Sequence, residues 1–159
     1  MIEQLKVLLR VKELREERAF RALSARRREV AEALREIETT REIGRESAAT
    51  LPAREDAIYR GIIGRVVDYG KIEDANGEMQ VLEKQHAKLL DAIERAVHVH
   101  ARLATQLAEA VQAHRKSVKD RDKYTVLTDE VASDLRAEAA HREENEIEDV
   151  FSARDGRSR

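Results

Sequence analysis

The sequence contains no cysteine and no tryptophan, one proline, six glycines and only 3% aromatic residues in a chain of 159. The absence of cysteine excludes disulfide bonds and thiolate metal sites, and it is compatible with a reducing compartment. So few aromatic residues leave little bulk for a round hydrophobic core. The 39% of charged residues are instead typical of long helices and coiled coils, which bury a seam.

Neither sign of charge prevails, because 30 Lys and Arg face 32 Asp and Glu for a formal net charge of −2. A nucleic-acid-binding protein needs a cationic excess on one face, so no nucleic-acid partner is expected. No apolar run approaches the roughly 18–20 residues that cross a bilayer. The first residues include an acid at Glu3 and no small-residue cleavage site follows them, so no signal peptide is expected. These features favour a soluble, cytoplasmic protein.

The spacing of apolar residues predicts an all-α fold, a long antiparallel two-helix coiled-coil hairpin. In the second half of the chain, two interleaved series recur every seven residues for about eight heptads. One series is Leu82, Leu89, Ala96, Leu103, Ala110, Ser117, Tyr124 and Val131, and the other is His86, Ile93, His100, Leu107, His114, Arg121, Thr128 and Leu135.

The first half of the chain is less regular. Residues 2–11 form a broad apolar face that is out of register with the residues after it, so a stutter is predicted between Arg15 and Ala19. From there, steps of three and four residues predict a seam of Phe20, Leu23, Arg27, Val30, Leu34, Ile37, Arg41 and Gly44.

Breaks in these patterns set the expected boundaries. Pro52 is expected to break the first arm, because proline suits the first turn of a new helix. Glycines cluster shortly afterwards, and Asp68 is a candidate N-cap for the second arm. The Asn76-Gly77 pair is an alternative turn. We expect one hairpin over residues 1–152, with arm one at 2–63, the tip at 64–68 and arm two at 69–152, followed by a disordered tail at 153–159.

Three histidines, His86, His100 and His114, occupy the same seam position. Their 14-residue spacing separates neighbours by about 21 Å along a helix, so no two can share a metal ion. We interpret them as polar residues that set the register of the seam. The sequence has no phosphate-binding, nucleophile-elbow or H-E-x-x-H motif, and a pair of helices offers no enclosed pocket. No catalytic residue, cofactor or metal is therefore expected.

Two groups of apolar residues exceed what a two-helix seam needs. One group surrounds the tip, where polar residues are expected, and the other lies near the chain ends, where the longer second arm should overhang the first. Each group could pack within the molecule or contact a partner. The tip group, with its one cation, is Tyr59, Ile62, Ile63, Arg65, Val66 and Val67, and the terminal group is Leu5, Leu8, Leu9, Ile147, Val150 and Phe151.

Two motifs carry a resemblance to a known family. The run from Leu5 to Glu16 has consecutive leucines followed by V-K-x-L-R, and the tip reads I-Y-R-G-I-I-G-R-V-V from Ile58, followed by Ile72-Glu73. In the order of these motifs, its length and the position of its tip, the chain resembles the YscO (SctO) family. These are the small stalk proteins of type III secretion injectisomes, related to the flagellar FliJ proteins. The resemblance covers most of the chain.

The resemblance implies a non-catalytic central stalk at the cytoplasmic base of the secretion apparatus, peripheral to its membrane machinery. The stalk would couple the hexameric secretion ATPase to the cytoplasmic ring of the export gate and promote assembly or activity of the ATPase. By the same resemblance, the terminal group would contact the ATPase and the tip group would contact the gate. An alternative is a coiled-coil chaperone or escort module that binds secretion chaperones or clients.

Overall fold

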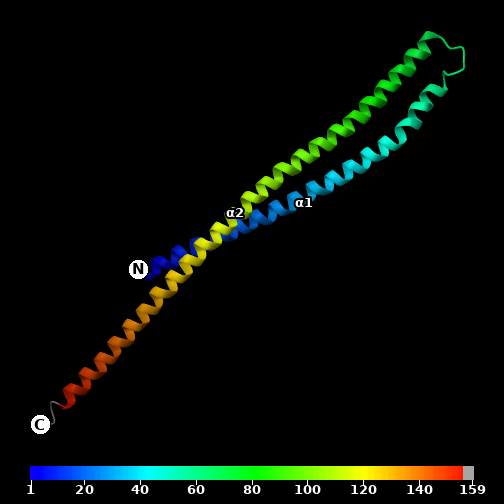
Figure 1. Ribbon diagram of the computed structural model, residues 1–159. Helices are drawn as coiled ribbons and strands as arrows, with labels where there is room; N and C mark the ends of the chain where they lie inside the picture. The colour runs from blue at the N-terminus through cyan, green and yellow to red at the C-terminus, as the bar shows by residue number, and fades with distance from the viewer. Residues whose placement is uncertain (156–159) are drawn as a thin grey trace. The chain divides into compact units, whose positions relative to one another are not determined.

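The structure, a computed structural model, describes residues 1–155 and consists of two long helices. Helix α1 spans Ile2–Arg60 and helix α2 spans Tyr69–Asp155. The helices are joined by a short turn and pack against each other in opposite directions (Figure 1). No strand occurs among the described residues. The predicted all-α antiparallel hairpin is confirmed.

Residues 61–68 form the turn. The carbonyl of Tyr59 accepts hydrogen bonds from the amides of Ile62 at 3.0 Å and Ile63 at 2.9 Å, which ends α1. Gly64 then takes a φ of 73°, a left-handed conformation that glycine adopts without strain. The amide of Lys71 donates to the Asp68 carboxylate at 3.0 Å, so the predicted N-cap is confirmed. Asn76 and Gly77 lie inside α2, and the alternative turn there is wrong.

Pro52 lies inside α1, so the predicted break of the first arm at this residue is wrong. Proline lacks an amide hydrogen and crowds the preceding carbonyls, and it usually ends or kinks a helix. Here the Pro52 side chain is exposed to solvent, and neighbouring side chains donate hydrogen bonds to backbone carbonyls that precede the proline. Thr50 donates to the carbonyl of Glu46 at 2.9 Å, and Arg54 donates to that of Ser47 at 3.2 Å.

The contacts divide the chain into two compact units. The turn-side unit is Ser24–Glu109, which holds the turn, and the terminal unit is Met1–Leu23 together with α2 from Ala110 onward. Each unit is a pair of antiparallel helical segments.

In the turn-side unit, small residues occupy much of the seam. Ala33, Ile37 and Gly44 of α1 are buried, as are Ala75 and Leu82 of α2. The predicted α1 seam consists of two rows of residues spaced seven apart. The row that contains Arg27, Leu34 and Arg41 is displaced by one residue. Its members are exposed, and the inward positions are those just before them: Arg26 instead of Arg27, Ala33 instead of Leu34, and Thr40 instead of Arg41.

In the terminal unit, α1 keeps the same spacing without interruption. Half-buried or buried positions recur there in steps of three and four, at Ile2, Leu5, Leu9, Lys12, Glu16, Ala19 and Leu23, and Glu13 beside this row is also half-buried. The predicted stutter is wrong, because Lys12 and Glu16 occupy seam positions that an apolar pattern does not reveal. Phe20, predicted to lie in the seam, lies at the edge of the seam and is 51% exposed.

The α2 seam agrees with the sequence over most of its length. Every predicted position from Leu82 to Val131 is buried or half-buried. Leu135 is 45% exposed, because the residues of α2 from 133 to 154 are all exposed and no helix covers them. The helix continues to Asp155, so residues 153–155 are helical where disorder was expected. The rest of the expected tail, residues 156–159, lies outside the described residues.

Candidate partner-binding surfaces

The turn presents apolar side chains to solvent. Val66 is fully exposed at 106% and Ile63 is 73% exposed. The next large apolar residues of α2, Tyr69 at 74% and Ile72 at 40%, are also exposed. We call these four residues the turn surface. Tyr69 is not in the tip group predicted from the sequence, although one of only three tyrosines in the chain, placed directly after a turn, was an available signal.

The remaining members of the tip group have different surroundings. Tyr59, Ile62 and Val67 are half-buried, and Arg65 is exposed. Ile62 lines a small hollow between the end of α1 and the start of α2, together with Lys71 and Ala75. Part of the apolar tip thus supports the turn itself, and Ile63 and Val66 are left free to contact a partner.

The terminal group also divides. Leu5 and Leu9 are half-buried on the side of α1 that faces α2, whereas Leu8 is 45% exposed. Ile147, Val150 and Phe151 are 55%, 60% and 65% exposed. The structure does not bring these two sets together, because Ile147 to Phe151 lie on the uncovered part of α2.

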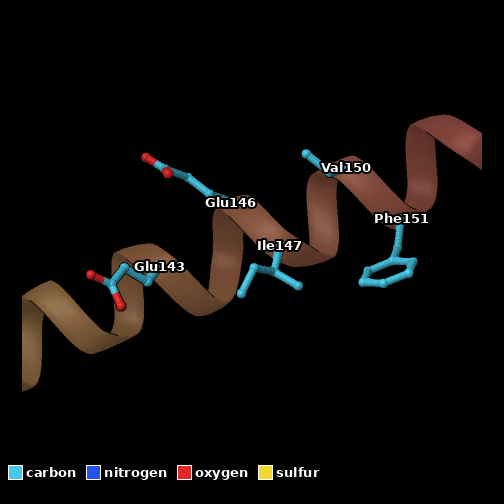
Figure 2. Close-up of a pocket in the computed structure, with 5 residues that line it drawn as sticks. All are labelled: Glu143, Glu146, Ile147, Val150 and Phe151. Atoms are coloured by element: carbon cyan, nitrogen blue, oxygen red, sulfur yellow. The ribbon is translucent and has the colours of Figure 1, made fainter.

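The uncovered part of α2 ends in an apolar stripe, which we call the C-terminal stripe and define as Ile147, Val150 and Phe151. Glu143 and Glu146 line the same shallow surface (Figure 2). Figure 2 shows all five side chains on successive turns of one helix, with no other segment beside them. Large apolar groups beside carboxylates suit a partner with an apolar groove and a basic rim.

Charged side chains join the helices of the terminal unit. The Glu16 carboxylate lies 3.1 Å from Nε2 of His114 and 3.3 Å from Nη1 of Arg121. Lys12 pairs with the Asp120 carboxylate at 3.5 Å, and its Nζ lies 5.0 Å from the centre of the Tyr124 ring.

The interpretation of the seam histidines as polar residues agrees with these contacts. The His114 ring also lies 5.7 Å from that of Phe20. In the turn-side unit, Nδ1 of His86 is 3.0 Å from the Ser47 hydroxyl.

Arg121 lies next to Asp122 and Glu16 in the terminal unit. Its pKa is raised, mainly by hydrogen bonding to Asp122, so it remains a cation beside Glu16.

Two further properties concern metals and membranes. Among residues 1–155, no cluster of three or more His, Asp or Glu side chains could hold a metal ion. In the same part of the chain, neither helix is long and apolar enough to cross a membrane.

Comparison with known proteins identifies the family. A family model described as "Type III secretion protein YscO" matches residues 5–153. No curated protein and no solved structure matches the chain significantly. The match includes both helices, the turn and the C-terminal stripe. This chain belongs to the YscO family of type III secretion proteins and is a component of that secretion machinery.

Proposed function

We propose that this protein is a non-catalytic central stalk that couples the hexameric secretion ATPase to the export gate and promotes assembly or activity of the ATPase. The observation that carries the proposal is the location of the exposed apolar residues. They are prominent at the turn, in Ile63 and Val66, and at the end of α2, in Val150 and Phe151. A component that links two assemblies needs one exposed apolar surface to bind each of them.

The C-terminal stripe is the proposed ATPase contact, together with Leu5, Leu8 and Leu9. An unaccompanied helix that carries Ile147, Val150 and Phe151 can insert into an apolar groove or pore. One stalk cannot match six equivalent subunits at the same time. A short stripe with an acidic rim, formed by Glu143 and Glu146, therefore suits a contact made with one or two subunits at once.

The turn surface is the proposed gate contact, together with the other tip residues Tyr59, Ile62, Arg65 and Val67. Ile63 and Val66 can be buried by a partner without rearrangement of the turn, because no part of the described chain covers them. Ile62 and Val67 are half-buried and would support the contact from below. The turn is short and held by backbone hydrogen bonds, so little conformational entropy is lost when it binds.

The ATPase contact is tested by hydrolysis and assembly assays with the secretion ATPase of the same system. Adding the wild-type chain is expected to raise the hydrolysis rate and the fraction of hexamers. The double variant Val150→Asp, Phe151→Asp should lose both effects, because two charges enter an apolar contact. Val126→Asp is the matched control, since Val126 is 56% exposed on the same helix. An absence of any effect of wild-type protein in micromolar excess would contradict the proposal.

The gate contact is tested by the affinity of the chain for the cytoplasmic ring of the export gate. Val66→Asp is expected to weaken binding about tenfold or more, as loss of a central apolar anchor does. Val81→Asp is the control, because Val81 is 55% exposed on α2 away from the turn. Equal affinities of both variants would argue against the turn as the contact.

The escort alternative makes a different prediction in the same assays. A chaperone-binding module would bind secretion chaperones or clients with an affinity that Val66→Asp or the Val150, Phe151 double variant reduces, and it would leave ATPase assembly unchanged.

A further inference from the structure

Pro52 creates a weak point within α1 that the rest of the helix does not have. A proline inside a helix removes one hydrogen bond, here the one that would end on the carbonyl of Ala48. A proline ring in a helix interior also crowds the carbonyl four residues before it, which weakens or kinks the helix at that point. The segment from Ala53 to Arg60, which leads into the turn, is therefore joined to the preceding part of α1 by an incomplete hydrogen-bond ladder.

One side chain, that of Arg54, bridges this weak point, and a second, that of Thr50, bonds to the backbone just before it. The Arg54 guanidinium, two residues after the proline, donates from Nη2 to the carbonyl of Ser47 at 3.2 Å and to its hydroxyl at 3.2 Å. The Thr50 hydroxyl donates to the carbonyls of Glu46 at 2.9 Å and Ser47 at 3.4 Å. Arg54 thus connects the segment after Pro52 to the segment before it, across two helical turns.

The same contacts reach the other helix. The Ser47 hydroxyl lies 3.0 Å from Nδ1 of His86 in α2, and both residues are half-buried. Arg54, Ser47 and His86 form a continuous hydrogen-bonded chain that begins after the proline, passes before it and ends on α2. All three residues belong to the turn-side unit.

We propose that Arg54, Ser47 and His86 are a latch across Pro52. When the latch is closed, the residues from Ala53 to Arg60 continue the axis of α1 and hold the turn in place. When Arg54 releases Ser47, this segment and the turn pivot at Pro52. Arg54 is exposed, so its hydrogen bonds compete with water and open reversibly. The inference concerns the chain alone and does not depend on the proposed function.

Amide hydrogen exchange of the full-length protein tests the latch, because local opening raises exchange in the affected segment only. Arg54→Ala is expected to raise exchange of the amides between residues 48 and 60 by about three- to tenfold, the factor that one net hydrogen bond represents. Exchange in the remainder of α1 and in α2 should be unchanged. Arg41→Ala is the matched control, since Arg41 is exposed on α1 and makes no side-chain hydrogen bond among the described residues.

A double-mutant cycle separates the latch from an ordinary surface contact. In the Pro52→Ala background the backbone ladder is complete, so adding Arg54→Ala should change exchange in this segment little. An effect of Arg54→Ala that is equally large in both backgrounds, or absent in both, would overturn the proposal. His86→Ala is expected to raise exchange of residues 48–60 as well, and no change in that variant would overturn the link to α2. Circular dichroism establishes that each variant keeps its helices.

Discussion

Gly44 illustrates how a single residue sets the fit between the helices. A Cβ atom at this position would lie 2.8 Å from Cδ1 of Ile93 on α2, closer than atoms of neighbouring side chains normally approach. Gly77, by contrast, has nothing within 4 Å of such an atom. Both glycines are inside helices, so they carry the same backbone cost and differ in the space around them.

This difference predicts opposite effects of two substitutions. Gly44→Leu should lower the free energy of unfolding by about 1–3 kcal/mol, the usual cost of overpacking. Gly77→Ala should raise it by about 0.5–1 kcal/mol, because alanine restricts the unfolded chain and favours helix. Urea denaturation followed by circular dichroism measures both. A neutral or stabilising Gly44→Leu would show that the seam at Ile93 has room that the structure does not give it.

Glu3 provides a prediction about pH. Its carboxylate is 2.8 Å from Nζ of Lys6, and this hydrogen bond, with the attraction of the lysine charge, holds the pKa of Glu3 below its ordinary value of 4.5. Since the folded state favours the charged carboxylate, the contribution to stability is present above the unfolded pKa and is lost as pH falls through the folded pKa.

NMR titration of the Glu3 carboxyl carbon measures this shift. Lys6→Met should bring the pKa of Glu3 back toward its ordinary value, because both the hydrogen bond and the nearby cation are removed. Arg10→Met is a suitable control, since Arg10 pairs with Glu13 and not with Glu3. The same pKa in wild type and Lys6→Met would mean that the ion pair does not form in solution.

At the scale of the elements, α2 consists of a covered part and an uncovered part. From residue 133 to residue 154 every side chain is exposed. The ion pairs within this part are weak ones between exposed partners, such as Arg142 with Glu138 at 3.7 Å. A helix without a neighbour is marginal in water at such lengths, because most helical stability in proteins comes from packing.

Removing this part should therefore have little effect on the paired helices. A chain truncated after residue 134 is expected to keep its free energy of unfolding within about 0.5 kcal/mol of the full chain, as changes at unpacked surfaces do. In the full chain, amides of residues 135–154 should exchange faster than those of the turn-side unit. A truncated chain that unfolds much more readily would reveal contacts made by this segment that are absent from the structure.

At the scale of the whole molecule, the chain has a large surface for its mass. It exposes 12584 Å² at 18.2 kDa, whereas a compact protein of that mass exposes about 8,100 Å². The reason is that a seam covers only one side of each helix. No side chain among the described residues is buried below 2% exposure.

Unfolding should consequently expose less new surface than in a compact protein. The slope of the free energy of unfolding against urea concentration is expected to lie below the values of compact proteins of the same length, because this slope follows the area exposed. Urea titrations at several protein concentrations measure it. A normal slope that appears only at high concentration would indicate that the chain buries further surface against another copy.

The covered part of α2 and the family could be predicted from residues alone because their signals are local. Leu82, Leu89 and Leu103 repeat at heptad spacing, and a repeat of this length has few other structural interpretations. The turn was predicted close to its observed place, because Gly64 and Asp68 are residue types that a turn and a helix start require. Of the tip group, however, only the structure separated the exposed Val66 from the half-buried Val67.

The amino-acid sequence by itself determined that this chain forms an antiparallel helical hairpin and that it resembles its family, since helical periodicity acts over a few residues and short motifs can be read directly. It favoured the turn near Gly64 but left Asn76-Gly77 open, and the structure decided between them. Tertiary structure alone decided which residues the helices turn toward each other. Ala33 faces inward in place of Leu34 and Glu16 occupies the seam, because close approach rewards small side chains and a charge with its partners opposite. Pro52 stays within α1, where Arg54 donates hydrogen bonds to the carbonyl and hydroxyl of Ser47 across it, contacts that a prediction from proline alone does not include.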